Sequence, residues 1–408
     1  MRISDINKKK FKTKRVKSFN NYGKIKAYFD YASTTPVDPQ VVKAMLPYFC
    51  KKFGNTMSLH SLGQEAKLIL ENAREKIANL INAKPSNIVF TSSATESNNL
   101  ALKGIAFANR KRGNHIIISS IEHSCVMESA KWLESQGFKV SKISVDKFGF
   151  VNPNDVEKAI RKETILVSII HASNEIGTIQ PIKEIGEICK KKNVYFHTDA
   201  AQSFLKIPID VNDMNIDLLT SSSHKIYGPK GAAFLFIKDG VLIEPLIHGG
   251  GHENGLRSST VNISAIIGFQ KACEIAFKNM DNDSKRIARL RDRLIEEILK
   301  IKGSHLNGFP KKGLYNIASF WFEGVDGEAI VIRCDLLGIA VSTGSACSSI
   351  KVEPSYALLA TGLKPKEANG SLRISLGRWT TEKEINYLLT VLPKIIEELR
   401  KVSYSFSK

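Results

Sequence analysis

Strand-like and helix-like segments alternate between residues 87 and 197, and this alternation restricts the possible folds more than any other feature. Buried strands are expected at residues 87–91, 115–118, 138–145, 164–170 and 194–197, and helices at residues 95–110, 126–136, 155–161 and 182–192. Strands joined in this way by helices form a mostly parallel sheet that helices cover on both faces. The sequence therefore predicts an α/β fold whose ligands bind beyond the carboxyl ends of the strands.

The chain divides into three regions. Residues 1–26 form a basic tail that we expect to be disordered, residues 27–280 a large α/β domain and residues 281–408 a smaller α+β domain. The extended residues 27–31 could also pack on the smaller domain. A long charged helix at residues 281–301 should bridge the domains. The smaller domain then contains three expected strands and a final helix, at residues 317–322, 339–342, 371–376 and 382–402.

The net charge of +19 could indicate a nucleic-acid-binding protein, so the distribution of basic residues matters. Residues 1–26 contain ten lysines and arginines against Asp5 alone, so nearly half of the excess charge lies in the tail. The remaining residues show no basic patch interleaved with aromatic side chains, and a nucleic-acid partner is not expected. The tail could be a transit peptide to a mitochondrion or a related organelle matrix, but it is rich in lysine rather than in arginine and serine. We therefore expect a cytoplasmic protein.

The six cysteines are scattered, and no two of them form a C-x-x-C pair. This spacing predicts neither a zinc site nor a disulfide framework, and it suggests a reducing compartment. His248 and His252 flank three glycines and could bind a metal, but no third ligand stands nearby, so a turn without metal is expected. No apolar run approaches the ~18 residues of a membrane helix, and no membrane partner is expected.

Lys225 stands between two apolar runs of strand length, residues 216–220 and 232–237, in the stretch Ser-Ser-His-Lys-Ile-Tyr-Gly-Pro-Lys-Gly. A lysine at the mouth of a buried strand pair loses hydration, which favours the neutral amine. A neutral amine attacks carbonyl groups and forms Schiff bases. The alternative is a lysine in a surface hairpin, and this stretch by itself does not decide between the two.

Polar residues in the other loops also allow two interpretations each. Residues 92–95 could bind a phosphate at a helix start or simply cap that helix. His123 could stack on a flat ring or transfer protons, or it could be an ordinary loop residue. Asp199 needs a cationic partner, which could be a protonated pyridine nitrogen or a core arginine. Cys347 lies among small residues and could be a reactive thiol or an inert one.

Together, these residues supply the groups that pyridoxal phosphate requires: a Schiff-base lysine, an acid for the pyridine nitrogen and a cradle for the phosphate. Further motifs follow in order, namely Ala-Thr-Glu-Ser at residues 94–97, Asn-Glu-Ile-Gly at 174–177, Thr-Asp-Ala-Ala-Gln at 198–202 and Gly-Ser-Ala-Cys at 344–347. With the Lys225 stretch, they resemble the motifs of the cysteine desulfurases of the NifS/IscS type, which have the class-V aminotransferase fold. The resemblance extends from about residue 28 to about residue 402.

The resemblance implies roles towards pyridoxal phosphate. Lys225 would hold the cofactor as an internal aldimine, Asp199 would keep its pyridine nitrogen protonated and Gln202 would bind its phenolic oxygen. His123 would stack on the ring and assist proton transfers. The phosphate would be bound by residues of both subunits of a homodimer, with Thr260 reaching across the interface to join Ala94, Thr95, Ser222 and His224.

The resemblance also implies the reaction. Asn174, close to the cofactor, and Arg373 would hold the carboxylate of L-cysteine, and Lys225 would remove its α-proton. The Cys347 thiolate would attack the substrate sulfur, so that alanine leaves and a persulfide remains on Cys347. The persulfide would supply sulfur to an iron–sulfur scaffold or for tRNA thiolation, and Cys347 could contact a cluster through such a scaffold.

A selenocysteine lyase or another class-V aminotransferase-fold enzyme is the alternative, although a simple aminotransferase needs no thiol. The sequence departs from the family pattern at Ser223 and Ser259, where glycine is common, and at Thr56 and Met57, where Pro-Ser is usual. These departures remove no reacting group, but they bear on the expected loop geometry. After its last helix the chain lacks the longer tail with which some members dock a scaffold, which leaves the sulfur acceptor open.

Overall fold

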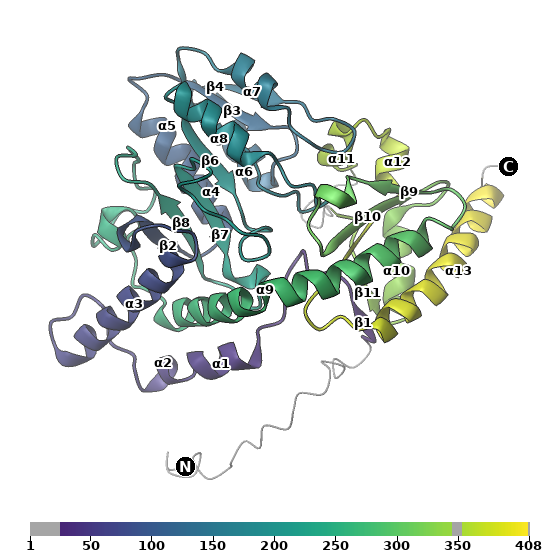
Figure 1. Ribbon diagram of the computed structural model, residues 1–408, viewed down its shortest axis with the longest axis horizontal. Helices are drawn as coiled ribbons and strands as arrows, with labels where there is room; N and C mark the ends of the chain where they lie inside the picture. Colours follow the sequence, from purple (N-terminus) through teal and green to yellow (C-terminus); the bar gives the residue numbers. More distant parts are fainter. Residues whose placement is uncertain (1–24, 345–352, 407–408) are drawn as a thin grey trace, which may run out of the picture.

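A seven-stranded sheet is the central element of the computed structural model, which describes residues 25–344 and 353–406 (Figure 1). Nearly all of the predicted basic tail lies outside the described residues. The strand order is β2-β8-β7-β6-β5-β3-β4. The strands are β2 (Ile88–Thr91), β3 (His115–Ser119), β4 (Lys139–Ile143), β5 (Thr164–Ser168), β6 (Tyr195–Asp199), β7 (Leu218–Ser222) and β8 (Ala233–Ile237).

This sheet is mostly parallel, as predicted. β8 runs antiparallel to its neighbours β2 and β7, whereas β7, β6, β5, β3 and β4 run parallel to one another. Ile116 and Ile118 of β3 belong to one buried apolar cluster, while Ile117 between them belongs to another. Because successive side chains of a strand point to opposite faces, the core lies on both faces of the sheet.

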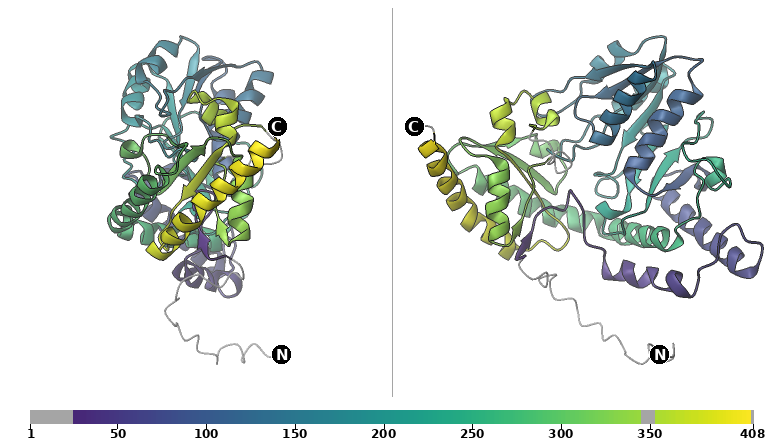
Figure 2. Two further views of the ribbon diagram at one scale, coloured as in Figure 1. Left: turned by 90° about the vertical axis from the view of Figure 1, so that its right-hand side faces the viewer. Right: turned by 180° about the vertical axis from the view of Figure 1, so that it is seen from behind.

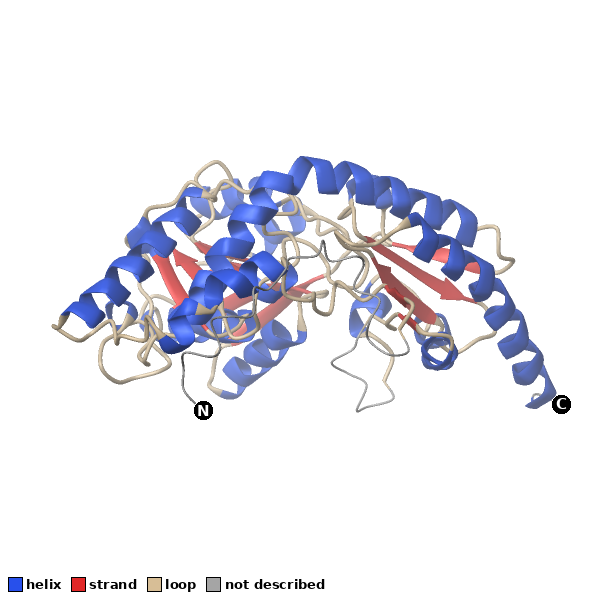
Figure 3. Cartoon of the chain, turned by 90° about the horizontal axis from the view of Figure 1, so that it is seen from below, coloured by secondary structure: helices blue, strands red, loops and turns tan. Residues whose placement is uncertain are grey.

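Helices connect the strands and cover both faces of the sheet (Figure 3). Val126 of α6 packs in the cluster on one face, and Ile185 of α8 in the cluster on the other. The helix predicted at residues 95–110 is present, but a π-helical turn over Leu100–Gly104 interrupts it. The helices of this part are α3 (Ser61–Asn79), α4 (Ala94–Asn99), α5 (Ile105–Ala108), α6 (Ser124–Ser135), α7 (Pro153–Ala159) and α8 (Ile182–Lys191).

The long helix α9 (Ile263–Ile298) connects the two parts of the molecule (Figure 1). The prediction that this helix begins at residue 281 was wrong, because the side chain of Asn262 caps a helix that starts at Ile263. The first half of α9 packs in the core of the large sheet through residues such as Phe269, whereas Leu294 of the second half packs in the smaller core. The first half is rich in apolar residues, and the charged residues typical of a surface helix begin only in the second half, which is why the sequence pattern placed the start too late.

The smaller part is built on a three-stranded antiparallel sheet with the order β12-β10-β9, set apart from the large sheet (Figure 2). β10 matches the strand predicted at residues 317–322. A separate apolar cluster lies between this sheet, the second half of α9, residues 327–336 and residues 382–406. The elements are β9 (Ser304–Asn307), β10 (Ile317–Phe322), α10 (Gly327–Leu336), α11 (Tyr356–Ala360), α12 (Pro365–Asn369), β12 (Ser371–Ser375) and α13 (Glu382–Phe406).

The first described residues run from the smaller part to the larger one (Figures 1 and 2). β1 (Ala27–Tyr28) pairs in parallel with β11 (Ile339–Ala340), and Phe29 is buried in the apolar cluster of the smaller part. The chain then continues through α1 (Pro39–Met45) and α2 (Pro47–Cys50), which lie along α9. The residues just after β1 are therefore placed between the two parts. None of the described helices is both long and apolar enough to cross a membrane.

Candidate active site

A pocket of about 300 Å³ lies at the carboxyl ends of the parallel strands, between the two parts of the molecule. β2, β3, β6 and β7 end at this edge of the large sheet, and the polar loops of the sequence follow them. The structure thus brings together residues that are far apart in the chain. The predicted site residues that line the pocket are Ala94, Thr95, His123, Asn174, Asp199, Gln202, His224, Lys225 and Arg373.

Lys225 reaches the pocket from a short 3₁₀ turn, Ser223–Lys225, that directly follows β7. Its Nζ donates hydrogen bonds to the main-chain oxygens of Ala32 and Ser33, at 2.6 and 2.7 Å. The surface-hairpin interpretation is therefore wrong, because the amine is held inside the pocket by the segment that joins the two parts.

Asp199 ends β6 and is 4% exposed. Its carboxylate accepts hydrogen bonds from Nδ2 of Asn98, at 2.7 Å, and from the main-chain N–H of Ala201, at 2.9 Å. Neither donor carries a charge, and none of the ion pairs among the described residues involves Asp199, so the core-arginine interpretation is wrong. A buried carboxylate that faces a pocket in this way favours a cationic group on a ligand.

Burial disfavours the charged form of both histidines of the pocket. Burial lowers the pKa of His123, with the charge of Lys225 adding to the effect and that of Asp199 opposing it. The main-chain N–H of Cys125 donates to Nδ1 of His123 at 3.3 Å, so the neutral ring carries its proton on Nε2. Burial, together with the nearby lysines, lowers the pKa of His224 to about 3. Both rings can therefore donate one N–H without carrying a charge.

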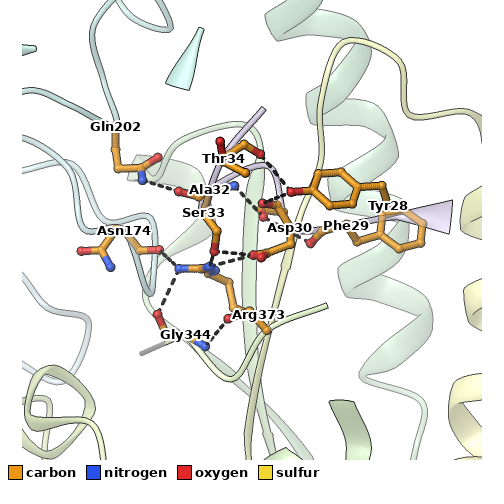
Figure 4. Close-up of polar contacts among 12 residues, drawn as sticks. Tyr28, Phe29, Asp30, Ala32, Ser33, Thr34, Asn174, Gln202, Gly344 and Arg373 are labelled. Carbon is orange, nitrogen blue, oxygen red and sulfur yellow. Dashed lines mark hydrogen bonds and ion pairs between the residues drawn. The ribbon is translucent and has the colours of Figure 1, made fainter. Parts of the chain in front are cut away.

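Arg373 of β12 is 2% exposed, and its guanidinium joins three segments (Figure 4). One terminal nitrogen donates to Oδ1 of Asp30, at 2.8 Å, and to Oγ of Ser33, at 2.7 Å. The other donates to the main-chain oxygens of Asn174, at 2.8 Å, and Gly344, at 3.1 Å. Nε has no partner among the described residues. The arginine is therefore fixed in place and keeps one unpaired donor.

The sequence analysis missed several residues of the pocket. Glu175 lines it, burial raises the pKa of its carboxyl group, and Ser355 donates to that carboxyl at 2.6 Å. Tyr356 also lines the pocket and donates to the main-chain oxygen of Glu122. Glu175 follows Asn174 in the Asn-Glu-Ile-Gly motif, and this position is a signal by which the sequence could have predicted Glu175 as a pocket residue. Ala32 contributes a main-chain oxygen, for which a sequence holds no signal.

Some predicted residues lie elsewhere. Ser222 is buried at the end of β7 and does not line the pocket, and Thr260 is exposed outside it. Cys347 lies outside the described residues. Ser223, at a position where glycine is common in the family, does not have a left-handed backbone, so its conformation does not require glycine, although its buried Oγ has no partner among the described residues. Among the described residues, no group of three histidine, cysteine or acidic side chains could hold a metal.

Comparisons with known proteins agree with this geometry. Residues 27–388 match the family described as aminotransferase class-V. The chain is 52% identical over 376 residues to cysteine desulfurase IscS 1 of Archaeoglobus fulgidus, an alignment that covers 92% of this chain and 98% of that relative. The chain belongs to the cysteine desulfurase family of class-V aminotransferases. The predicted family is thereby confirmed.

Other members of this cysteine desulfurase family support the assignment. IscS of Clostridium botulinum is 50% identical over 380 residues, which is 92% of this chain and 96% of the relative. A solved NifS-like protein has a TM-score of 0.86 at 39% identity and covers 91% of this chain and 100% of its own. A structure described as SspA in complex with cysteine has a TM-score of 0.78 at 39% identity, with 87% and 100% covered. These likenesses confirm the predicted fold class.

Proposed function

We propose that this protein is a cysteine desulfurase that uses pyridoxal phosphate to take sulfur from L-cysteine, with L-alanine as the second product. The observation that carries the proposal is the buried Asp199 carboxylate, which accepts hydrogen bonds from the neutral donors of Asn98 and Ala201 in the same pocket as the Lys225 amine. The cysteine bound to SspA, at 39% identity, supports an amino-acid substrate.

The side chains of the pocket fit pyridoxal phosphate. Asp199 would pair with the protonated pyridine nitrogen, which supplies the cation that its buried carboxylate favours. Lys225 would hold the aldehyde carbon, and Gln202 would donate through Nε2 to the phenolic oxygen. His123 would stack on the ring, since a neutral imidazole is not repelled by a pyridinium. When bound, the cofactor would withdraw electrons from the α-carbon of the substrate.

The phosphate would lie at the start of α4. Ala94 and Thr95 line the pocket there, and main-chain N–H groups at a helix start attract anions. Ser222 and His224, on either side of Ser223, would add hydrogen bonds from the end of β7. Thr260 would reach the phosphate of the other subunit in a homodimer, and its exposure in the single chain is what such a role requires.

The substrate carboxylate would bind between Asn174 and Arg373. Arg373 lines the pocket, so its guanidinium faces the space in which a substrate carboxylate would lie. Asp30 neutralises part of the guanidinium charge and holds its plane, which limits the poses that a carboxylate can adopt.

Sulfur transfer would involve Lys225 and Cys347. Lys225 would remove the α-proton of the bound cysteine, and the Cys347 thiolate would attack the substrate sulfur. A bond forms between the two sulfur atoms while the carbon–sulfur bond of the substrate breaks. The electron pair stays on the carbon skeleton, which is protonated to give alanine. The persulfide would then pass to an iron–sulfur scaffold or another acceptor, with the cytoplasm as the proposed compartment.

Two variants test this proposal. Protein reconstituted with pyridoxal phosphate should absorb visible light, and Lys225→Ala should lose that absorbance, whereas Lys230→Ala, at an exposed position nearby, should keep it. Cys347→Ser should keep the absorbance but form no persulfide from L-cysteine. Persistent sulfur release by Cys347→Ser would refute the assigned nucleophile. Alanine release from selenocysteine but not from cysteine would favour a selenocysteine lyase instead.

A further inference from the structure

Lys206 is a buried lysine beside the pocket that no step of the proposed reaction uses. It lies in the loop after β6 and is 9% exposed. Its Nζ donates to the main-chain oxygen of Gln202 at 2.7 Å and lies 3.4 Å from Oε1 of the same residue. The amine therefore contacts both oxygens of Gln202.

This position is unfavourable for a lysine. None of the ion pairs among the described residues includes Lys206. A cavity of about 30 Å³ lies beside Lys206 and Lys225, but Asp283, the carboxylate that lines it, pairs with Arg378 at 2.8 Å instead. Burial, with the charge of Lys225 added, lowers the pKa of Lys206 to about 7. A cation without a counter-ion is costly to bury, so some other interaction must offset this cost.

The backbone beside Lys206 is strained as well. Leu205 has a φ of +54°, in the left-handed region that residues other than glycine rarely adopt. Such a conformation costs about 1 kcal/mol for a residue with a Cβ atom. Strained backbone tends to occur where function fixes the geometry of a loop. The strained turn ends at Lys206, whose amine donates to the main-chain oxygen of Gln202, four residues earlier in the chain.

Two contacts bear on which way the Gln202 amide faces: the Lys206 amine lies on the side of its oxygen, and the Ala32 oxygen accepts from its nitrogen. A side-chain amide can turn by 180° and exchange its oxygen with its nitrogen, but the N–H groups that the Lys206 amine has in either charge state attract the oxygen. With Oε1 on the Lys206 side, Nε2 donates to the main-chain oxygen of Ala32 at 2.8 Å. The same oxygen accepts the hydrogen bond from Lys225. Gln202 and Lys225 thus share one carbonyl group, and Lys206 is connected to it through Gln202 (Figure 4 shows the contact of Gln202 with Ala32).

We propose that Lys206 is a positioning residue, which holds the Gln202 amide with its N–H groups towards the pocket and thereby tunes the cofactor bound at Lys225. The inference rests on the proposed function, in which Gln202 donates to the phenolic oxygen of the cofactor. Without Lys206, Oε1 of Gln202 loses the donor on its side and, among the described residues, only the Ala32 oxygen still orients the amide, so Nε2 is held less firmly towards the phenolic oxygen.

The test measures the pH midpoint at which the visible absorbance of bound pyridoxal phosphate changes. In Lys206→Met, which keeps the length of the side chain but has no donor, we expect the midpoint to rise by about half a pH unit or more, since a lost donor makes the phenolic oxygen more basic. Lys206→Arg, which restores donors and charge, should bring the midpoint back. Lys142→Met, at an exposed position on the edge strand β4, is the matched control and should leave it unchanged.

Gln202→Leu decides how Lys206 acts. If Lys206 works through the amide, Lys206→Met should add nothing to the midpoint shift of Gln202→Leu, whereas an equal shift in both backgrounds would overturn the inference. Gln202→Leu alone should also raise the midpoint, and an unchanged midpoint there would refute the inference even if Lys206→Met folds poorly. An unchanged midpoint in Lys206→Met would refute the inference alone. A wild-type protein that binds no pyridoxal phosphate would refute the proposed function and the inference with it.

Discussion

Glu122→Gln should make the protein more stable, by an amount that grows with pH. Glu122 is 1% exposed beside His123, and burial raises the pKa of its carboxyl group to about 8. Oε1 accepts from Oγ of Ser119, at 2.5 Å, and from the main-chain N–H of Ile170, at 2.7 Å, while Oε2 has no partner in the described part of the chain. Glutamine has nearly the same shape and keeps the accepting oxygen. It cannot ionise.

The size of the effect follows from proton linkage. The ordinary pKa of a glutamate is 4.5, so between pH 5 and 8 the unfolded chain has released a proton that the folded chain still holds. The stability that Glu122 contributes is complete below pH 4.5 and is lost as the pH rises towards 8. At about 1.4 kcal/mol per pH unit, the wild type should lose about 3 to 4 kcal/mol relative to the variant between pH 5 and 8.

Thermal unfolding at several pH values checks this prediction. An unfolding entropy of about 2 cal/mol/K per residue gives about 0.9 kcal/mol/K for 408 residues, so the gap between the melting midpoints should widen by about 4 °C. Glu128→Gln, at an exposed position on α6, is the control and should show no such widening. A gap between wild type and Glu122→Gln that stays constant from pH 5 to 8 would refute the raised pKa.

Two further predictions concern the two cores. Arg74→Met should destabilise the protein by about 3–5 kcal/mol, because it leaves the buried Glu253, which pairs with Arg74 at 2.7 Å, without a cation. In denaturant titration, the double variant Arg74→Met with Glu253→Gln should lose clearly less stability. Equal losses in the single and the double variant would contradict a buried charge at Glu253. Phe29→Ala should cost about 3–5 kcal/mol, since the ring is fully buried in the smaller core, whereas Phe53→Ala, 66% exposed, should change the denaturation midpoint little.

The sequence was most informative where local pattern decides the structure. The alternation of strands and helices predicted the parallel sheet, because the period of buried residues is a property of each segment by itself. The same pattern placed Asp199 and Lys225 at strand ends, and parallel strands carry their ends to one edge. The start of α9 was missed because an apolar half-helix in a core shows no polar face.

The contacts between distant segments were decided only by the tertiary structure. Nothing near Lys225 in the chain indicates that its amine binds the oxygens of Ala32 and Ser33, and nothing near Arg373 indicates Asp30 as its partner. Such pairs form because two separate cores hold the crossing segment between them. Lys206 is the clearest case, since a lysine in a loop suggests a solvated side chain. Only the packing around β6 buries its amine and turns it towards Gln202.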